Sequence, residues 1–101
     1  MSVEQPGEGI ETAGDPLIGE LREQITSVDR ELLAAVNRRI EIVRRLHDHK
    51  QAHGLPLRDP GREASLLAEL REANRGPLSP QGVGEFFAHL LELVRRELHG
   101  A

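Results

Sequence analysis

The spacing of apolar residues predicts a long amphipathic helix in the first half of the chain. Residues on one helical face recur at steps of three and four, and they are Leu21, Ile25, Val28, Leu32, Val36, Arg39, Val43, Leu46 and Lys50. Seven of these nine are aliphatic, so Arg39 and Lys50 lie on a face that we expect to be buried. Because an unpaired buried cation costs roughly several kcal/mol, we expect an anion to meet both.

Start and stop signals divide the chain into three predicted helices. Asp15-Pro16 combines a good N-cap with a residue favoured at the first helical position, and Asp59-Pro60 and Ser79-Pro80 repeat this signal. Gly54, with Pro56 two residues later, ends the first helix. The helices are expected over about 16–53, 60–74 and 80–99. No segment alternates like a strand, so the predicted fold class is all-α.

Apolar positions in the two shorter helices predict a core. In the second helix they are Leu66, Leu67 and Leu70, and in the last they are Val83, Phe86, Phe87, Leu90, Leu91, Val94 and Leu98. The first helix would be roughly 50 Å long, whereas a domain of this size has a radius of gyration of about 13 Å. We therefore expect a second copy to cover the remaining stripe, in an intertwined helical homodimer.

Composition limits the classes of function. The chain has 101 residues and a net charge of −4, which argues against nucleic-acid binding. It contains no cysteine, and no apolar run is long enough to cross a bilayer. Residues 1–15 are acidic and contain neither a signal peptide nor a targeting pattern, so we predict a disordered tail followed by one domain over 16–101. A cytoplasmic location is expected.

Helical geometry groups the candidate binding residues. Arg39 and Lys50 are eleven residues apart, about 20° around the helix and roughly 16 Å along it, so they face one elongated pocket. Arg22 is about 100° from Arg39 around the axis, where it can reach a pocket of another subunit. Asp59, Arg62 and Glu63 form a second cluster, at the start of the second helix.

Such a set of side chains suits a small ligand with two carboxylates and a hydroxyl group. Arginine binds carboxylates through two parallel hydrogen bonds, and an acid accepts from a hydroxyl. Simpler interpretations compete with this one. Arg39 and Lys50 can reach solvent along an apolar surface, Asp59 can be only a helix cap, and Arg62 and Glu63 can be a solvated pair.

His47, His49 and His53 also raise the question of a metal site, because the last two have a spacing that places both rings on one face. We favour a solvated helix end, since no third ligand is suitably spaced and cations suit a helix C-terminus. The sequence also lacks a nucleophile with an adjacent base, a glycine-rich phosphate loop and an aromatic stacking platform. We therefore expect chemistry without covalent, metal or nucleotide assistance, and no cofactor.

Several motifs resemble those of AroQ-type chorismate mutases. They are Leu21-Arg22-Glu23-Gln24-Ile25, Val28-Asp29, Leu32-Leu33, Arg38-Arg39, Lys50 and the run from Pro56 to Glu63. The resemblance extends over roughly 17–99, and it is the spaced set rather than any single piece that is specific. It implies an all-helical enzyme that converts chorismate to prephenate in the shikimate pathway, for aromatic amino-acid biosynthesis.

The resemblance also implies a role for each candidate. Arg39 would bind a substrate carboxylate in its own subunit, and Arg22 would reach a carboxylate in the partner's pocket. Lys50 would donate to the ether oxygen and to a carboxylate, and Arg62 would support the carboxylate end. Glu63, together with Asp59, would hold the ring hydroxyl. Catalysis would consist of holding the reactive conformer and stabilising charge as the ether bond breaks.

The last helix departs from the family pattern. Counted from Phe87, the positions of a small polar residue and of a Gln or Glu that donates to the ether oxygen fall on Val94 and Leu98, while Glu97 is one residue out of register. Loss of one such donor typically lowers the rate by about 10²–10³, which predicts a weak catalyst. Some family members with a similar gap are activated by DAHP synthase, so the resemblance implies that enzyme as a candidate partner.

Two alternatives remain open at the level of the sequence. One keeps the fold and changes the ligand to isochorismate or 4-amino-4-deoxychorismate, which differ from chorismate near Glu63. The other is a non-catalytic or regulatory helical dimer, in which Val94 and Leu98 are ordinary core residues.

Overall fold

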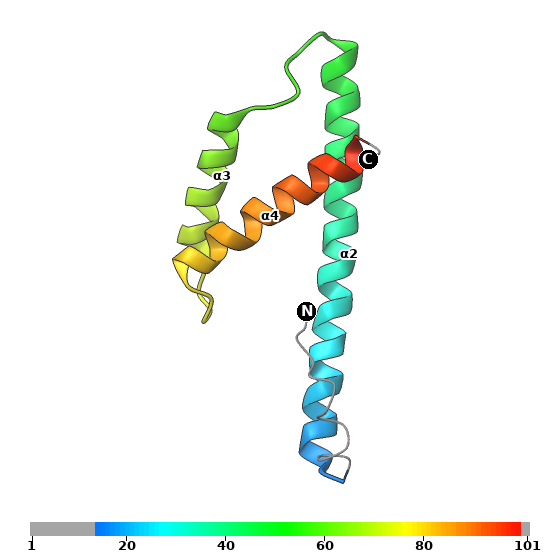
Figure 1. Ribbon diagram of the computed structural model, residues 1–101, viewed down its shortest axis with the longest axis vertical. Coiled ribbons are helices and arrows are strands. Elements are labelled where there is room, and N and C mark those ends of the chain that lie inside the picture. The colour runs from blue at the N-terminus through cyan, green and yellow to red at the C-terminus, as the bar shows by residue number, and fades with distance from the viewer. Residues whose placement is uncertain (1–13, 100–101) are drawn as a thin grey trace. The chain divides into compact units, whose positions relative to one another are not determined.

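The computed structural model describes residues 14–99, and the elements within that range are all helices (Figure 1). Helix α2 spans Pro16–Ala52, α3 spans Pro60–Ala73 and α4 spans Pro80–Leu98. The predicted all-α class and the three helices are confirmed, with ends within about two residues of those expected. The predicted acidic tail over 1–15 lies almost entirely outside the described residues.

Side-chain caps and a glycine turn define the ends of α2. The Asp15 carboxylate accepts from the backbone N–H of Leu17 at 2.9 Å, which is the expected N-cap. At the other end Gly54 has φ +67°, and its N–H donates to the carbonyl of Gln51 while that of Leu55 donates to Lys50. These two bonds make a Schellman motif, which glycine favours because it adopts positive φ without steric cost.

Helices α3 and α4 begin in the same way. The side chain of Asp59 accepts from the N–H of Arg62 at 3.0 Å, and that of Ser79 accepts from Gly82 at 2.9 Å. Each cap is followed by a proline at the first helical position, where no N–H donor is needed. The predicted capping signals are therefore confirmed at all three helix starts.

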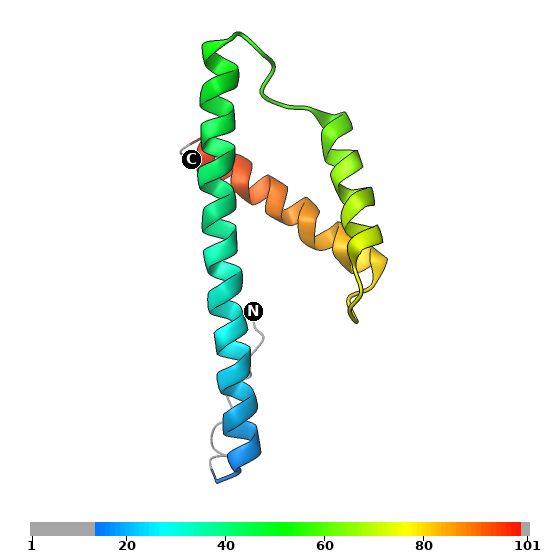
Figure 2. The same cartoon turned by 180° about the vertical axis from the view of Figure 1, so that it is seen from behind.

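The chain divides into two units, with the boundary between Arg38 and Arg39 inside α2. The second unit contains the rest of α2 together with α3 and α4. In two opposite views the first turns of α4 lie beside the last turns of α3 (Figures 1 and 2). Arg71 Nε donates to the carbonyl of Pro80 at 3.0 Å, and its guanidinium lies against Gly84, where a Cβ atom would clash.

The core of the second unit is small and centred on α4. Among the described residues the buried hydrophobic side chains are Val83, Leu90 and Val94. The three predicted leucines of α3 are only partly buried, as are Phe87, Leu91 and Leu98. Phe86, which was also predicted on the inner face, is 40% exposed, so the inner face is narrower than the sequence indicates.

Many apolar side chains of α2 are exposed. In the first unit they include Leu21, Ile25, Val28 and Leu32, and in the second Ile42 and Leu46. Val28, for example, is 60% exposed. Isolated surface leucines are ordinary, but a row of large aliphatic side chains at helical spacing is typical of a surface that another polypeptide covers.

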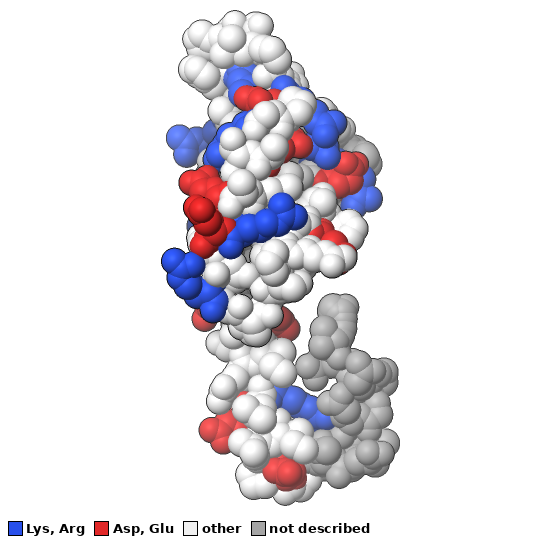
Figure 3. Space-filling model, turned by 90° about the vertical axis from the view of Figure 1, so that its left-hand side faces the viewer, with Lys and Arg blue, Asp and Glu red and all other residues white. Residues whose placement is uncertain are grey.

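Acidic and basic side chains are interspersed on the face drawn in Figure 3, where no extended basic area is visible. Arg44 and Glu41 form an exposed ion pair, at 3.3 Å. In the described part of the chain no helix combines the length and the apolar character needed to cross a bilayer.

Candidate functional site

Lys50 is held in place by the turn that ends α2. Its carbonyl accepts the longer-range bond of the Schellman motif, from the N–H of Leu55 at 2.8 Å. The ammonium group donates to the carbonyl of Leu57 at 3.3 Å, and the residue is partly buried. An ammonium has three donors, so this bond leaves donors for a ligand.

Arg39 is a partly buried cation that lies near a second one. Burial lowers the pKa of Arg39, and the positive charge of Arg62 lowers it further. Both effects disfavour the charged form of the guanidinium, which nevertheless stays protonated at neutral pH. Arg39 and Arg62 therefore create a local excess of positive charge of the kind that an anion would relieve.

Asp59 and Arg62 lie at the N-terminus of α3. One carboxylate oxygen of Asp59 caps the helix through the N–H of Arg62. The guanidinium of Arg62 forms an exposed ion pair with Glu69, with 3.8 Å between Nη1 and Oε1. Free N–H groups and the helix dipole favour negative charge at this end. A ligand carboxylate near Arg62 would therefore interact favourably with both.

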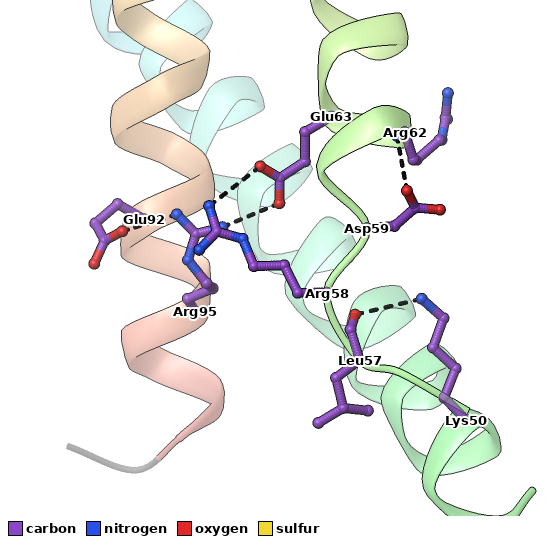
Figure 4. A network of polar contacts seen from close by, with 8 residues as sticks. All are labelled: Lys50, Leu57, Arg58, Asp59, Arg62, Glu63, Glu92 and Arg95. Atoms are coloured by element: carbon purple, nitrogen blue, oxygen red, sulfur yellow. Dashed lines mark hydrogen bonds and ion pairs between the residues drawn. The ribbon is translucent and has the colours of Figure 1, made fainter. Parts of the chain in front are cut away.

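Glu63 is turned toward α4 and lies between two arginines (Figure 4). Its Oε2 accepts from Arg95 Nη1 at 3.1 Å, and its Oε1 forms an ion pair with Arg58 Nη2 at 3.6 Å. Arg95 also donates to Glu92 at 2.8 Å. This hydrogen bond lowers the pKa of Glu92 and raises the pKa of Arg95.

Reasoning from the sequence missed Arg95. It lies 32 residues from Glu63, in a last helical turn where basic residues are expected for their interaction with the helix dipole. The adjacent Arg96 carries the same local signal and is exposed. Only the packing of α4 against α3 distinguishes the two arginines, so no pattern along the chain identifies Arg95.

The residues that depart from the family pattern lie along α4. Val94 is 3% exposed and belongs to the core, whereas Glu97 is exposed. Leu98 is partly buried and lines a shallow groove with residues of α2 that include Arg44 and His47. The side chains of Val94 and Leu98 are hydrocarbons, so neither can form a hydrogen bond to a ligand.

Five of the predicted site residues lie in the second unit, and they are Arg39, Lys50, Asp59, Arg62 and Glu63. Of these the structure brings Arg39 into electrostatic range of Arg62, and it joins Asp59 to the backbone of Arg62. Glu63 faces α4 instead. Arg22 belongs to the first unit and is partly buried, so the roles of all six residues stay predictions.

The described residues contain no group of three or more His, Cys, Asp or Glu side chains that is arranged to hold a metal ion. The rings of His49 and His53 lie 4.2 Å apart between centroids. Nδ1 of His53 lies 2.9 Å from the carbonyl of His49, so this nitrogen is engaged within the helix end.

Comparison with known proteins identifies the family and the fold. The family model described as chorismate mutase type II matches residues 21–98. The solved structure of chorismate mutase (form II) from Thermus thermophilus superposes with a TM-score of 0.77 and 28% sequence identity. That match covers 81% of this chain and 93% of the other, so the two folds agree over most of both chains.

Two curated relatives match part of the chain. The T-protein of Enterobacter agglomerans is 46% identical over 52 residues, which is 52% of this chain. The T-protein of Haemophilus influenzae is 39% identical over 61 residues, or 59% of this chain. The matches span only 14% and 16% of those proteins, so this chain corresponds to a small part of each.

Proposed function

Since residues 21–98 place the chain in the chorismate mutase type II family, we propose that it converts chorismate to prephenate. Chorismate carries two carboxylates and a ring hydroxyl. The observation that carries the proposal is the placement of partly buried cations in the second unit: Arg39, within electrostatic range of Arg62, and Lys50, whose ammonium donates to the Leu57 carbonyl at 3.3 Å. Lys50 adds a third cation at the end of α2.

The reaction requires little of the protein beyond positioning and charge stabilisation. In this Claisen rearrangement the ether C–O bond breaks while a C–C bond forms within one molecule, so no base or nucleophile is needed. Holding the reactive conformer and stabilising charge on the ether oxygen are the contributions that fixed cations can make. The second unit offers such cations in Arg39, Lys50 and Arg62.

Each candidate residue has a role in the proposed complex. Arg39 binds one carboxylate, and Arg62 supports the carboxylate end. Lys50 donates to the ether oxygen and a carboxylate with the donors that its bond to Leu57 leaves available. Glu63, with Asp59, accepts from the ring hydroxyl, and one Asp59 oxygen meanwhile caps α3.

A second copy of the chain completes the proposed site. The exposed aliphatic row of α2, including Leu21, Ile25 and Leu32, supports a homodimer in which these side chains are buried. Arg22 then contributes to the pocket of the partner subunit. We also propose that the protein works in the cytoplasm, in aromatic amino-acid biosynthesis.

The side chains of Val94 and Leu98 cannot donate a hydrogen bond. In this proposal Lys50 is therefore the donor to the ether oxygen. Because one missing donor of this type lowers a rate by about 10²–10³, activity of the isolated protein should be low. This supports an activating partner, for which DAHP synthase is the candidate. The buried position of Val94 also favours a second function, a regulatory subunit without activity of its own.

The test is a comparison of chorismate consumption by the wild type, Arg39→Met and Arg38→Met. Arg38 is the exposed neighbour of Arg39, so its replacement removes the same charge outside the site. We expect Arg39→Met to lower kcat/KM by at least about 10² and Arg38→Met to change it little. Equal rates for the three proteins would contradict the assignment, and no turnover with DAHP synthase present would favour the regulatory subunit.

A further inference from the structure

We propose that Arg95 is a positioning residue that fixes the carboxylate of Glu63, the group to which the proposed function assigns the ring hydroxyl. This inference rests on the proposed function and deepens it, because it assigns a task to α4 that the motifs in α2 and α3 do not contain. It starts from the contact between Arg95 Nη1 and Glu63 Oε2, at 3.1 Å (Figure 4).

Arg95 is better placed for this task than the other arginine at Glu63. The side chain of Arg95 is 28% exposed, and that of Arg58 is 60% exposed and lies farther away, at 3.6 Å. Arg95 is itself fixed by Glu92, whose carboxylate accepts from Nη2 one turn earlier in α4 at 2.8 Å. The guanidinium therefore joins a carboxylate of α4 to one of α3.

Glu63 keeps the capacity to bind a ligand in this arrangement. A carboxylate has about four lone-pair sites. Arg95 uses one of them in a hydrogen bond to Oε2, and Arg58 forms only an ion pair with Oε1, at 3.6 Å. A further hydrogen bond, from a hydroxyl group, can still be accepted. The contact with Arg95 removes rotamer freedom that a flexible glutamate would otherwise lose when the ligand binds.

A purely structural ion pair makes a different prediction. Exposed and partly exposed pairs usually contribute little to stability, and such a pair would not change how substrate binds. A positioning residue acts through Glu63, so its removal should raise KM with little change in kcat, provided that Glu63 binds ground state and transition state alike.

The experiment is a double-mutant cycle on purified protein with chorismate as substrate. We expect Arg95→Met to raise KM about 3- to 10-fold, the effect of freeing one rotamer-rich side chain, and Arg95→Lys to recover part of the loss. In the Glu63→Gln background, Arg95→Met should change KM by less than about twofold, because the residue it positions is already altered. Arg96→Met, an exposed neighbour, is the matched control.

Each outcome is decisive. An unchanged KM for Arg95→Met, with or without a lower Tm, would overturn the inference and leave the proposed function intact. An equal rise of KM for Arg95→Met in both backgrounds would also overturn the inference, since Arg95 would then act independently of Glu63. Absence of chorismate turnover by the wild type, with DAHP synthase added, would overturn the proposed function and the inference together.

Discussion

Arg39 in α2 and Arg62 in the first turn of α3 are two cations that repel each other. Burial lowers the pKa of Arg39, and the charge of Arg62 lowers it further. Glu69 already forms an exposed ion pair with Arg62, at 3.8 Å, so the further anion that this arrangement favours is one that reaches Arg39. We propose that the pair belongs to a binding site, at a cost to the stability of the free protein.

The repulsion predicts that Arg39→Met leaves the thermal stability of the free protein unchanged or raises it. The folded pKa of Arg39 is lower than the unfolded one, so the charged form is destabilising at neutral pH, and relief comes only as pH rises through the folded pKa. A neutral side chain of similar length removes that cost. Thermal unfolding followed by circular dichroism measures the change.

The same variant should lose activity, so stability and activity change in opposite directions. Lys50→Met should instead lower both activity and thermal stability, because it removes the hydrogen bond to the Leu57 carbonyl. A clear drop in Tm for Arg39→Met would contradict the view that Arg39 serves a ligand and would indicate a structural role.

The exposed row on α2 predicts a dimer that a single charge can disrupt. Ile25 is 43% exposed and lies on the stripe, so Ile25→Glu should place a charge in the proposed interface and produce monomers. Burying an unpaired carboxylate costs roughly several kcal/mol, which disfavours the dimer. Light scattering coupled to size exclusion gives the mass of wild type and variant.

Glu31→Gln provides the control for this experiment. Glu31 is exposed and lies next to Leu32, outside the apolar stripe, so its replacement should leave the mass of the assembly unchanged. A wild-type protein that is monomeric at all concentrations would contradict the dimer.

A mixing experiment tests whether Arg22 acts in the partner's pocket. Arg22→Ala and Arg39→Ala should each be nearly inactive, because each lacks one carboxylate ligand. After unfolding and refolding together in equal amounts, half of the dimers are mixed and one site in each mixed dimer is intact. Activity should then recover to about a quarter of the wild-type value.

The recovered activity depends on geometry alone, so it needs no knowledge of absolute rates. If Arg22 serves its own subunit, every site in the mixture lacks one arginine, and activity stays at the level of the separate variants. That result would contradict the assignment of Arg22 while leaving Arg39 in place.

The helix ends were predictable from local chemistry. Asp15, Asp59 and Ser79 cap the helices as expected, and Gly54 adopts the positive φ that its place after α2 indicates. These features depend on residues within five positions of one another, so the sequence contains the whole signal. The resemblance to the family also placed its candidate residues on the predicted helices.

Contacts between helices, and the burial of individual side chains, were harder to predict from the sequence. The contact between Glu63 and Arg95 depends on how α4 packs against α3, and a helical pattern does not distinguish Arg95 from Arg96. Phe86 was expected inside and is 40% exposed, because seven apolar residues on α4 form a wider face than α3 covers. Which of them are buried depends on the partner surface, and a single helix cannot specify that.

Leu98 provides a way to raise activity. If its position corresponds to a donor that this chain lacks, Leu98→Gln should raise kcat, by up to about 10²-fold where the donor is fully restored. Leu98 is partly buried at the end of α4, so the amide can be accommodated there at less cost than at Val94, which is 3% exposed. Steady-state kinetics with chorismate measures the effect.

Leu93→Gln is the matched control, since Leu93 is 37% exposed on the same helix and has no proposed role. Equal kcat values for wild type and both variants would show that position 98 lies outside the site.

The most direct measurement is an NMR experiment that identifies the product formed from chorismate by the purified protein. The rate of its formation is compared with that of the uncatalysed reaction. We predict prephenate, formed faster than in the absence of protein and faster again when DAHP synthase is added. If chorismate decays at the uncatalysed rate under both conditions, or if the protein releases pyruvate instead of forming prephenate, the proposed function is contradicted.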